Sequence, residues 1–510
     1  MNPCSFSHAR STVAGLLLCI GLLFFPSTRA LAATPAEGAS NRAELAARID
    51  SQITQPRFAA AQWGVAVISL DSGHTVYAHE ADRLLQPAST TKLFTAALAL
   101  AVLGPQYRLP TRLFASASLV RGRLNGPLIL YGMGDPTLGS SSSPDWAEQL
   151  ASQAAARGLK FVQGDLIADD TYFASPTFGN GWEAGDLQSW FAVPSSALSV
   201  QENIATITVT PGITGKPAGI SVSPVEAAPA IDNRMLTGAA RSRDDINLYR
   251  APGTRTLYAF GHLAARSPAK HFKLAMVDPA WVAGTQLRQA LKRHDIHVTG
   301  KLRTIHWPQP ETATLDQSGL LGEVLSPPLQ EIVARGLKRS QNLYMQNLLL
   351  AVGAAQSTDA PGFSSSENRA LHALRQLLTE VGIPPASYLI EEGAGLSRRD
   401  LVTPNAMARL LGYLAAQPFA STVRAGLPVA GVDGTLIHRM RGTAAANNLQ
   451  AKTGSMSQVH CLAGYVTTAA GERLAFAIML NNYQRPGNAP SASSDVDAIA
   501  VQLANYRGRD

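Results

Sequence analysis

Hydrophobic residues near the beginning of the chain predict a short hairpin followed by one wholly apolar helix. An apolar run at residues 63–70, a turn at residues 71–74 and a second run at residues 75–78 have the pattern of two paired strands. Residues 90–103 then predict a helix that ends at Gly104-Pro105. Because this helix has no polar face, we expect it to be buried in the core of a domain.

The end of the chain has a second set of apolar segments. A strand-rich region begins near Gln450, and residues 461–467 and 473–480 predict two buried strands around the turn at residues 469–472. A final helix is predicted over about residues 495–506. It has no basic amphipathic face of the kind that binds a membrane surface.

The middle of the chain has a different pattern. Residues 111–314 contain short strand-like runs, such as residues 128–131 and 205–210, separated by many Gly, Pro and Ser turns. We interpret this part as inserted, mostly β, material, so that the two ends of the chain form one discontinuous domain around it. There is no internal repeat of the kind that marks a solenoid.

The first residues have the three parts of a secretory signal peptide. His8 and Arg10 precede an apolar run at residues 13–25, and an Ala-Leu-Ala sequence at residues 30–32 supplies a cleavage signal. The run is shorter than the ~20 residues that a spanning helix needs. We therefore expect residues 1–32 to be removed on export, leaving no stable transmembrane segment.

Composition and charge narrow the classes of function. The 510 residues are 46% hydrophobic and 15% charged, which favours a large folded core over disorder. The formal net charge of +7 is small for this length, and the sequence contains no dense cluster of basic residues. We therefore expect no nucleic-acid partner. Signal cleavage would leave Cys461 as the only cysteine, which excludes an internal disulfide.

One short motif in the first half of the chain has a chemical rationale. Ser89 and Lys92 stand three residues apart at the start of the apolar helix, so they fall on one helix face. A serine hydroxyl is inert at neutral pH unless a neighbouring base removes its proton. A lysine amine can be that base when burial or a nearby cation lowers its pKa. Alone, the pair is also what a helix cap with a surface lysine looks like.

Two further motifs follow in order. Ser340-Gln341-Asn342 precedes a helix-like segment at residues 343–352, and Lys452-Thr453-Gly454-Ser455 lies at the end of a strand. The ordered set S-x-x-K, S-x-N and K-T-G is similar to the signature of penicillin-binding proteins and serine β-lactamases. His294 and His297 stand close together, but no Cys or acidic ligand pattern completes a zinc site there. We therefore expect neither a metal nor an organic cofactor.

The resemblance extends over nearly the whole chain after the signal peptide. The chain resembles the D-alanyl-D-alanine carboxypeptidase/endopeptidase group of low-molecular-weight penicillin-binding proteins (class C, penicillin-binding protein 4 type, peptidase S13). The segments that carry it, besides the three motifs, are residues 134–138, 169–173, 192–199, 202–203, 393–398 and 427–436. The long gap between the first two motifs leaves room for two inserted domains, which typical serine β-lactamases lack. The E-x-x-L-N sequence of class A β-lactamases is also absent from this chain.

The resemblance implies an α/β (α+β) transpeptidase/β-lactamase-like fold with two inserted domains. The transpeptidase-like domain would comprise residues 33–110 and 315–510. Inserted domain II would comprise residues 111–200 and 272–314, and inserted domain III residues 201–271.

The resemblance also assigns roles to the motif residues. Ser89 would be the nucleophile on the bond between two D-alanines, Lys92 its base, Ser340 the proton relay to the leaving amine, and Asn342 a hydrogen-bond partner of Lys92 and the substrate. Lys452 would attract the terminal carboxylate and help to keep Lys92 neutral by repulsion. Thr453 and Ser455 would bind the same carboxylate, and Gly454 would let the strand lie close to the substrate. The backbone N–H groups of Ser89 and Ser455 would form the oxyanion hole.

Several positions remain open at this level. Asp169 matches a family aspartate that reaches the site from an inserted domain, but an Asp-Asp pair before an aromatic is as often part of a turn. Arg398 either lines the cleft or is solvated, and Cys461 is expected to be a core thiol.

The implied enzyme is a periplasmic D-Ala-D-Ala carboxypeptidase that also cleaves D-Ala–diaminopimelate cross-bridges, with peptidoglycan peptides ending in D-Ala and β-lactam antibiotics as its partners. Two alternatives stay open: a serine β-lactamase or esterase on the same scaffold, and a non-catalytic peptidoglycan-binding protein.

Overall fold

The computed structural model describes residues 38–310, 319–356 and 363–509. The signal peptide predicted over residues 1–32 lies outside them. Within these ranges, no helix combines the length and apolar character needed to span a bilayer. The helices of this part are α1 (Arg42–Ile53), α2 (Lys92–Val102), α3 (Trp146–Ala156), α4 (Pro279–Arg293), α5 (Leu329–Lys338), α6 (Asn342–Ala355), α7 (Ser366–Glu380), α8 (Pro404–Ala416), α9 (Ala420–Gly426) and α10 (Ala492–Asn505).

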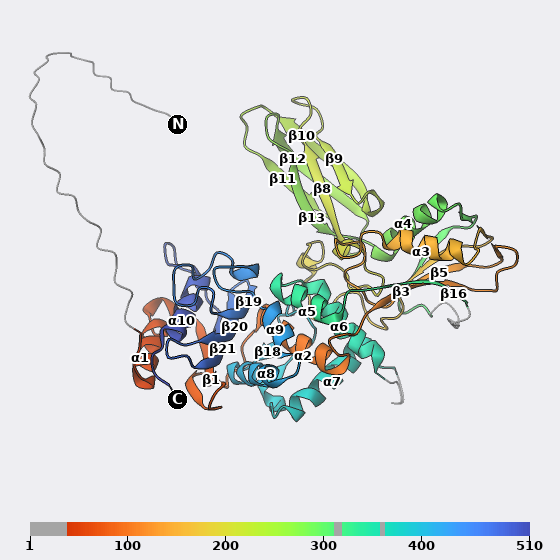
Figure 1. The fold of residues 1–510 in the computed structure, drawn as a ribbon. Coiled ribbons are helices and arrows are strands. Elements are labelled where there is room, and N and C mark those ends of the chain that lie inside the picture. The colour runs from red at the N-terminus through yellow and green to blue at the C-terminus, as the bar shows by residue number, and fades with distance from the viewer. Residues whose placement is uncertain (1–37, 311–318, 357–362, 510) are drawn as a thin grey trace, which may run out of the picture. The chain divides into compact units, whose positions relative to one another are not determined.

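The two ends of the chain meet in one antiparallel sheet of five strands, in the order β19-β20-β21-β1-β2. Figure 1 shows the red β1 beside the blue β21, although they are far apart in the sequence. This confirms that the ends form a discontinuous domain. The strands are β1 (Gln62–Ser69), β2 (Thr75–His79), β19 (Gln450–Met456), β20 (Val459–Thr467) and β21 (Arg473–Asn481).

Both faces of this sheet are covered, which explains why its strands have nearly continuous apolar runs. On β21, Phe476 and Ile478 pack in one cluster with residues of α1 and α10, while Ala475 and Ala477 pack in another with residues of α8. The alternation follows from the opposite directions of successive side chains in a strand. Helix α2 belongs to the second cluster, where Leu93, Phe94 and residues 96–99 have no exposed surface. The predicted burial of the apolar helix is therefore confirmed.

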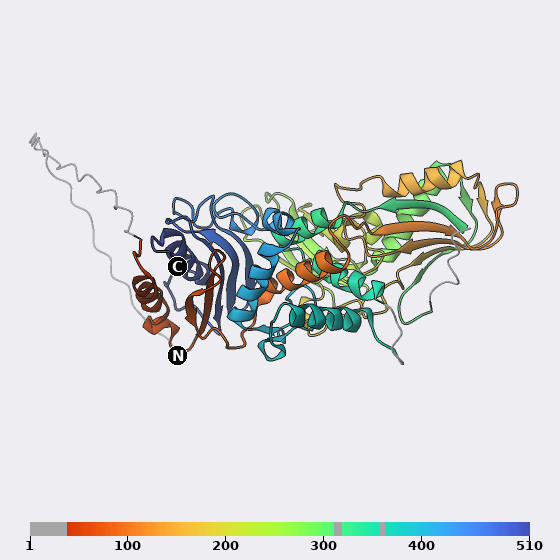
Figure 2. The same ribbon diagram turned by 60° about the horizontal axis from the view of Figure 1, so that its bottom comes forward.

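The first inserted part contains a mixed sheet in the order β15-β7-β5-β3-β16, and a small parallel sheet in the order β14-β6-β4. Helices α3 and α4 contribute Trp146, Leu150 and Leu287 to the cluster that covers the mixed sheet, and Figure 2 shows α3 along one of its faces. The strands are β3 (Pro110–Ala115), β4 (Arg123–Leu124), β5 (Leu128–Gly132), β6 (Phe161–Val162), β7 (Leu166–Asp169), β14 (His297–Val298), β15 (Leu302–Ile305) and β16 (Leu320–Leu325).

The second inserted part contains two sheets of three strands, in the orders β10-β12-β11 and β13-β8-β9. Val209, Met235 and Ala259 are fully buried between them and form a small core. The strands are β8 (Ile204–Thr210), β9 (Gly219–Ser223), β10 (Ala230–Gly238), β11 (Asp245–Tyr249), β12 (Thr256–Ala264) and β13 (Lys270–Ala275).

The predicted domain borders stay a prediction. β16 pairs with β3, and so residues 320–325 share a sheet with the inserted strands. A remaining pair, β17 (Tyr388–Leu389) and β18 (Leu401–Val402), lies next to the site described below.

Candidate active site

Ser89 and Lys92 come together at the start of α2, as the sequence predicts. Ser89 lies in a 3₁₀ turn, Ala88–Thr91, and Lys92 is the first residue of the α-helix that follows. Lys92 Nζ donates a hydrogen bond to Ser89 Oγ over 2.8 Å. The lysine is fully buried, whereas Ser89 is partly exposed. A serine open to solvent on one side therefore contacts an amine that is closed off from it.

The Lys92 ammonium has two further partners from distant parts of the chain. Its Nζ donates to Asn342 Oδ1 over 2.6 Å and to the carbonyl oxygen of Ala394. Asn342 Nδ2 in turn donates to the carbonyl oxygen of Phe191 over 2.7 Å. Because the amide nitrogen of Asn342 is held by that carbonyl, its oxygen is directed at the lysine. The S-x-x-K and S-x-N motifs thus meet.

The third motif joins through Lys452. Its Nζ donates to Ser340 Oγ over 2.8 Å and to the carbonyl oxygen of Thr453 over 2.8 Å. Ser340 lies between α5 and α6 with a positive φ of 57°, which turns the chain sharply before Asn342 begins the next helix. The five residues proposed as catalytic from the sequence therefore form two hydrogen-bonded groups, Ser89 with Lys92 and Asn342, and Ser340 with Lys452. The two groups are close enough for the charge of Lys92 to lower the pKa of Lys452.

The substrate-binding residues predicted on the K-T-G motif lie on β19, which is an edge strand of the five-stranded antiparallel sheet. Thr453 Oγ1 is hydrogen-bonded to Thr435 Oγ1 over 2.8 Å, and Ser455 is exposed. An edge strand leaves backbone groups on one side available to a ligand. This placement is compatible with a peptide that lies along β19.

Gly454 is required for a reason that differs from the one the sequence suggested. A Cβ at this position would lie 2.5 Å from the carbonyl oxygen of Pro87 and 3.3 Å from the Cβ of Ala88. The glycine thus lets β19 approach the protein's own backbone just before Ser89, rather than only a substrate. Gly395 makes a similar approach, because its Cβ would lie 2.0 Å from the carbonyl oxygen of Ala88.

We expect Gly454→Ala to push β19 away from the turn that carries Ser89. The clash is with backbone, so the cost in the free energy of unfolding should be about 1–3 kcal/mol. The rate of acylation of Ser89 should fall with it. Thermal unfolding and stopped-flow acylation would measure the two effects. Gly185→Ala is the matched control, since a Cβ there would meet nothing within 4 Å. Equal stability and acylation in both variants would contradict this account.

The two lysines both have lowered pKa values. Burial lowers the pKa of Lys92 to about 7, against the opposing effect of the Glu392 and Asp400 carboxylates. Burial also lowers the pKa of Lys452 well below its usual value, and the charge of Lys92 lowers it further. The repulsion between the lysines therefore lowers the pKa of Lys452, whereas the low pKa of Lys92 is caused by its burial.

Glu392 is a functional candidate that the sequence analysis missed. Its side chain is fully buried and accepts hydrogen bonds from the backbone N–H groups of Ala394 and Leu396, each over 2.8 Å. It thereby shapes the loop whose Ala394 carbonyl accepts from Lys92. The sequence feature that could have indicated Glu392 is its place directly before residues 393–398, a segment that resembles the family.

Glu392 is paired with a second buried carboxyl group, Asp400. Burial, followed by the charge of Glu392, raises the pKa of Asp400 well above its usual value. Asp400 therefore favours its neutral form next to Glu392.

We expect the double variant Glu392→Gln/Asp400→Asn to lower the pKa of Lys92, because both carboxylates stabilise the protonated amine. Asp400 is replaced as well, since removal of Glu392 alone would lower the pKa of Asp400 and let its carboxylate take over. If neutral Lys92 is needed for acylation, the rate rises with pH through this pKa, and the midpoint in the variant should move down by about half to one pH unit. The pH profile of the acylation rate measures it. The partly exposed Glu226→Gln is the control. An unmoved midpoint in the folded double variant would show that these carboxyl groups do not tune the lysine.

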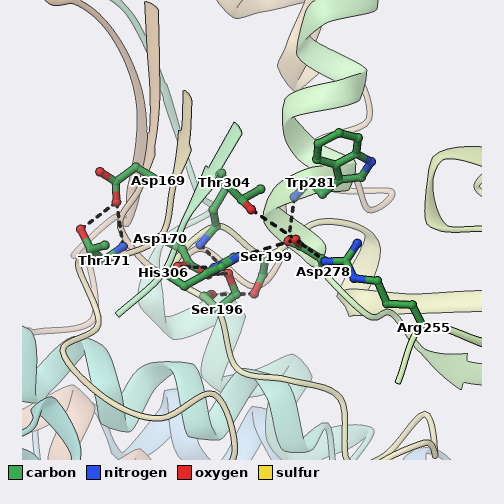
Figure 3. A network of polar contacts seen from close by, with 11 residues as sticks. Asp169, Asp170, Thr171, Ser196, Ser199, Arg255, Asp278, Trp281, Thr304 and His306 are labelled. Atoms are coloured by element: carbon green, nitrogen blue, oxygen red, sulfur yellow. Dashed lines mark hydrogen bonds and ion pairs between the residues drawn. The ribbon is translucent and has the colours of Figure 1, made fainter. Parts of the chain in front are cut away.

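Asp169, which was predicted to bind the substrate, contacts its own turn. It is fully buried at the end of β7, and its Oδ1 accepts from the backbone N–H of Thr171 over 2.9 Å and from Thr171 Oγ1 over 2.7 Å. Figure 3 shows the carboxylate beside Thr171. These contacts fit the turn interpretation of the Asp-Asp pair, and a role of Asp169 in substrate binding stays a prediction.

Two other open positions have clear surroundings. Cys461 is buried, and burial raises the pKa of its thiol, as expected for a core cysteine. Arg398 lies at the rim of the site, where its Nε pairs with Glu183 over 3.0 Å and its Nη1 donates to the carbonyl oxygen of Ser457. It therefore connects the loop around Glu183 to the turn after β19.

The arrangement has the parts needed for nucleophilic attack on a carbonyl group. A serine oxygen contacts an amine whose pKa of about 7 leaves about half of it neutral at pH 7, and a second buried lysine contacts the Ser340 hydroxyl.

Comparison with known proteins gives consistent matches over nearly the whole chain. The profile of the D-Ala-D-Ala carboxypeptidase 3 (S13) family matches residues 45–505. The D-alanyl-D-alanine carboxypeptidase of Actinomadura sp. (strain R39) is 36% identical, over 97% of this chain and 91% of the relative. The D-alanyl-D-alanine carboxypeptidase DacB of Haemophilus influenzae is 27% identical, over 85% of this chain and 88% of the relative.

The fold comparison agrees with the sequence comparison. The crystal structure of penicillin binding protein 4 (dacB) from Haemophilus influenzae superimposes with a TM-score of 0.75 at 25% sequence identity. The match covers 90% of this chain and 97% of that chain. The expected transpeptidase-like architecture with inserted domains is thereby confirmed.

Proposed function

The chain belongs to the D-Ala-D-Ala carboxypeptidase 3 (S13) family, and we propose from that premise that it hydrolyses D-Ala-D-Ala peptides through an acyl-enzyme on Ser89. The hydrolase and its carboxypeptidase class follow from the family. The serine mechanism is the proposal, and one observation carries it. The fully buried Lys92 amine, with a pKa of about 7, donates to Ser89 Oγ over 2.8 Å.

In the first half of the proposed reaction, Ser89 Oγ attacks the carbonyl carbon between the two D-alanines. Neutral Lys92 takes the hydroxyl proton as the Oγ–C bond forms. The backbone N–H groups of Ser89 and Ser455 stabilise the negative charge that develops on the carbonyl oxygen. Asn342 keeps the amine in place through its Oδ1.

The C–N bond then breaks, and the leaving D-alanine amine needs a proton. Lys92 gives up the proton that it took from Ser89, and Ser340 relays this proton to the amine, so that Lys92 is neutral again before water attacks. The Ser340 hydroxyl is held by the buried Lys452 amine over 2.8 Å. The terminal carboxylate of the substrate would be held by Lys452, Thr453 and Ser455. A carboxylate next to Lys452 also favours its protonated form, so substrate binding raises the low pKa of that lysine.

Water completes the reaction by attacking the ester on Ser89, with Lys92 again accepting the proton. This step releases the shortened peptide and regenerates the serine. A β-lactam would enter the same first step, and its opened ring would stay attached to Ser89. The proposed partners are accordingly peptidoglycan peptides ending in D-Ala, and β-lactam antibiotics.

We also propose cleavage of D-Ala–diaminopimelate cross-bridges. The same acyl group is transferred to Ser89, and only the leaving amine differs, so the machinery described above serves both reactions. The site of action would be the periplasm, reached through the signal peptide predicted over residues 1–32.

Product analysis on purified peptidoglycan fragments tests the proposal. The protein without residues 1–32 is incubated with a disaccharide pentapeptide and, separately, with a cross-linked dimer. We expect release of free D-alanine from the first and conversion of the second to monomers, both followed by liquid chromatography and mass spectrometry. Folded protein that releases no D-alanine would overturn the carboxypeptidase mechanism. An intact dimer alone would remove only the endopeptidase activity.

A further inference from the structure

A cavity of about 390 Å³ lies where the second inserted part contacts the first, and Ser89 is not among the residues that line it. Its wall includes Leu187, Gln188 and Ser196 from the first inserted part, and the turn between β11 and β12, residues 250–255, from the second. Asp170, Asp278 and His306 complete its polar side. None of these residues has a role in the mechanism proposed above.

The two acids of this cavity are already neutralised. His306 Nδ1 lies 2.9 Å from Asp170 Oδ1, and its Nε2 lies 3.5 Å from Asp278 Oδ2, so one imidazole bridges both carboxylates (Figure 3). The hydrogen bonds to Asp170 and then to Asp278 raise the pKa of His306 to about 10, which keeps the ring positively charged at neutral pH.

Further donors reinforce this balance. Arg255 Nη2 approaches Asp278 Oδ2 at 3.3 Å, and Ser196 Oγ donates to Asp170 Oδ2 over 2.6 Å. The backbone N–H of Trp281 donates to Asp278 Oδ1 over 2.9 Å. With His306 and Arg255 both cationic, Asp170 and Asp278 leave no net negative charge in the cavity.

Arg250 is the cation left over. It lines the cavity and is half-buried, and within the described residues its guanidinium has no carboxylate partner. Burial lowers the pKa of this guanidinium, which means that its charged form is poorly solvated there. The backbone of Arg250 is held in place, because its N–H donates a hydrogen bond to Gln188 Oε1 over 2.8 Å. A fork of N–H donors in such a place matches a carboxylate.

We propose that this cavity is a second binding site, in which Arg250 receives a carboxylate of the peptidoglycan peptide whose end is cleaved at Ser89. The inference rests on the proposed function for the identity of the peptide, and on the charge balance and the shape of the cavity for the place where it binds.

The connection to Ser89 is short. Gln188 in the cavity wall and Phe191, whose carbonyl holds Asn342, are three residues apart in one loop. Three residues span at most about 11 Å, whereas an extended peptide of five residues spans about 17 Å. One peptide stem is therefore long enough to reach from the Asn342 side of this loop to the cavity. Such a site would select substrates by carboxylates away from the scissile bond.

The test is a binding measurement with the Ser89 site closed. The protein without residues 1–32 is first acylated with benzylpenicillin, and its mass confirms the adduct. It is then titrated calorimetrically with a peptidoglycan tetrapeptide that has free carboxylates, and with the same peptide fully amidated. We expect binding of the free acid, and binding at least about tenfold weaker for the amide.

Variants locate the interaction. Arg250→Gln should weaken binding of the free acid at least about tenfold, and Arg250→Lys should weaken it less because the charge remains. The exposed Arg241→Gln, from the same inserted part, should bind as the parent protein does. Thermal unfolding shows whether each variant is folded.

Equal binding by folded Arg250→Gln and Arg241→Gln would overturn the inference, as would an acylated protein that binds neither peptide. If benzylpenicillin forms no adduct, the proposed function fails separately. The same titration on Ser89→Ala then decides the question of the cavity.

Discussion

Replacing Ser89 by alanine should abolish release of D-alanine from a peptide that ends in D-Ala-D-Ala. The serine oxygen forms the acyl bond and no other group of the described site replaces it, so the rate should fall by about 10³-fold or more. The fold should be retained, because Ser89 is partly exposed and its removal opens no core cavity. The measurement is the rate of D-alanine release from a diacetylated lysyl-D-Ala-D-Ala tripeptide.

The control for this variant replaces another serine whose hydroxyl forms a hydrogen bond but lies outside the site. Ser267→Ala removes a hydroxyl that donates to Asp244 on the second inserted part, and it should leave the rate unchanged. Turnover by Ser89→Ala within a few fold of the parent rate would mean that a different nucleophile or an activated water performs the reaction.

Replacing Lys92 should have the second largest effect. Lys92→Gln removes the amine that takes the serine proton, and general-base catalysis contributes about 10²–10⁴-fold, so acylation should slow by that range. The parent protein should show a rate that rises about tenfold per pH unit below about pH 7 and levels off above it, because only the neutral amine is a base and the pKa of Lys92 is about 7. The variant should lose this inflection. Acylation by benzylpenicillin, followed between pH 5 and 9, measures both.

A surface lysine provides the comparison. Lys216→Gln changes an exposed side chain of the second inserted part and should preserve both the rate and the inflection. Because loss of a buried charge can also change folding, Lys92→Arg serves as a second variant that keeps a cation but cannot act as a base near pH 7. An inflection near pH 7 in either folded Lys92 variant would assign the titration to some other group.

The geometry within each motif could be predicted from the sequence, because each motif is one short local structure. That the three motifs share one site was expected from the resemblance to the family. Lys92 follows Ser89 by one helical turn, and Asn342 begins a helix right after Ser340. What the sequence does not show is how close the backbones come. The positive φ of Ala88 and the need for Gly454 both depend on the approach of β19 to the turn at Ser89, which is a long-range contact.

The acids around Lys92 were missed for a related reason. Glu392 contacts the backbone N–H groups of its own loop, and Asp400 is placed against it by the same loop, so neither forms a motif of side chains at fixed spacing. Asp169 stays a predicted substrate-binding residue. The resemblance suggested that role, and the structure adds that its Oδ1 accepts two hydrogen bonds within the turn at Thr171.

The first inserted part contains more helix than its turn-rich composition indicated. Helices α3 and α4 cover the sheet there, although the expectation was mostly β. A local signal existed for α4, since Asp278 caps it and Pro279 occupies its first position. The short strands around it, two to six residues long, dominated the pattern and hid the helices.

The most direct test of the central claim is mass spectrometry of the protein without residues 1–32 after brief incubation with benzylpenicillin, beside Ser89→Ala. The account predicts a persistent mass gain equal to one benzylpenicillin, located on the peptide that contains Ser89 and absent from the variant. An adduct on another residue, or an equal adduct in Ser89→Ala, would contradict the assignment of Ser89 as the nucleophile. Rapid hydrolysis of the antibiotic without a lasting adduct would contradict the carboxypeptidase mechanism and point to a β-lactamase.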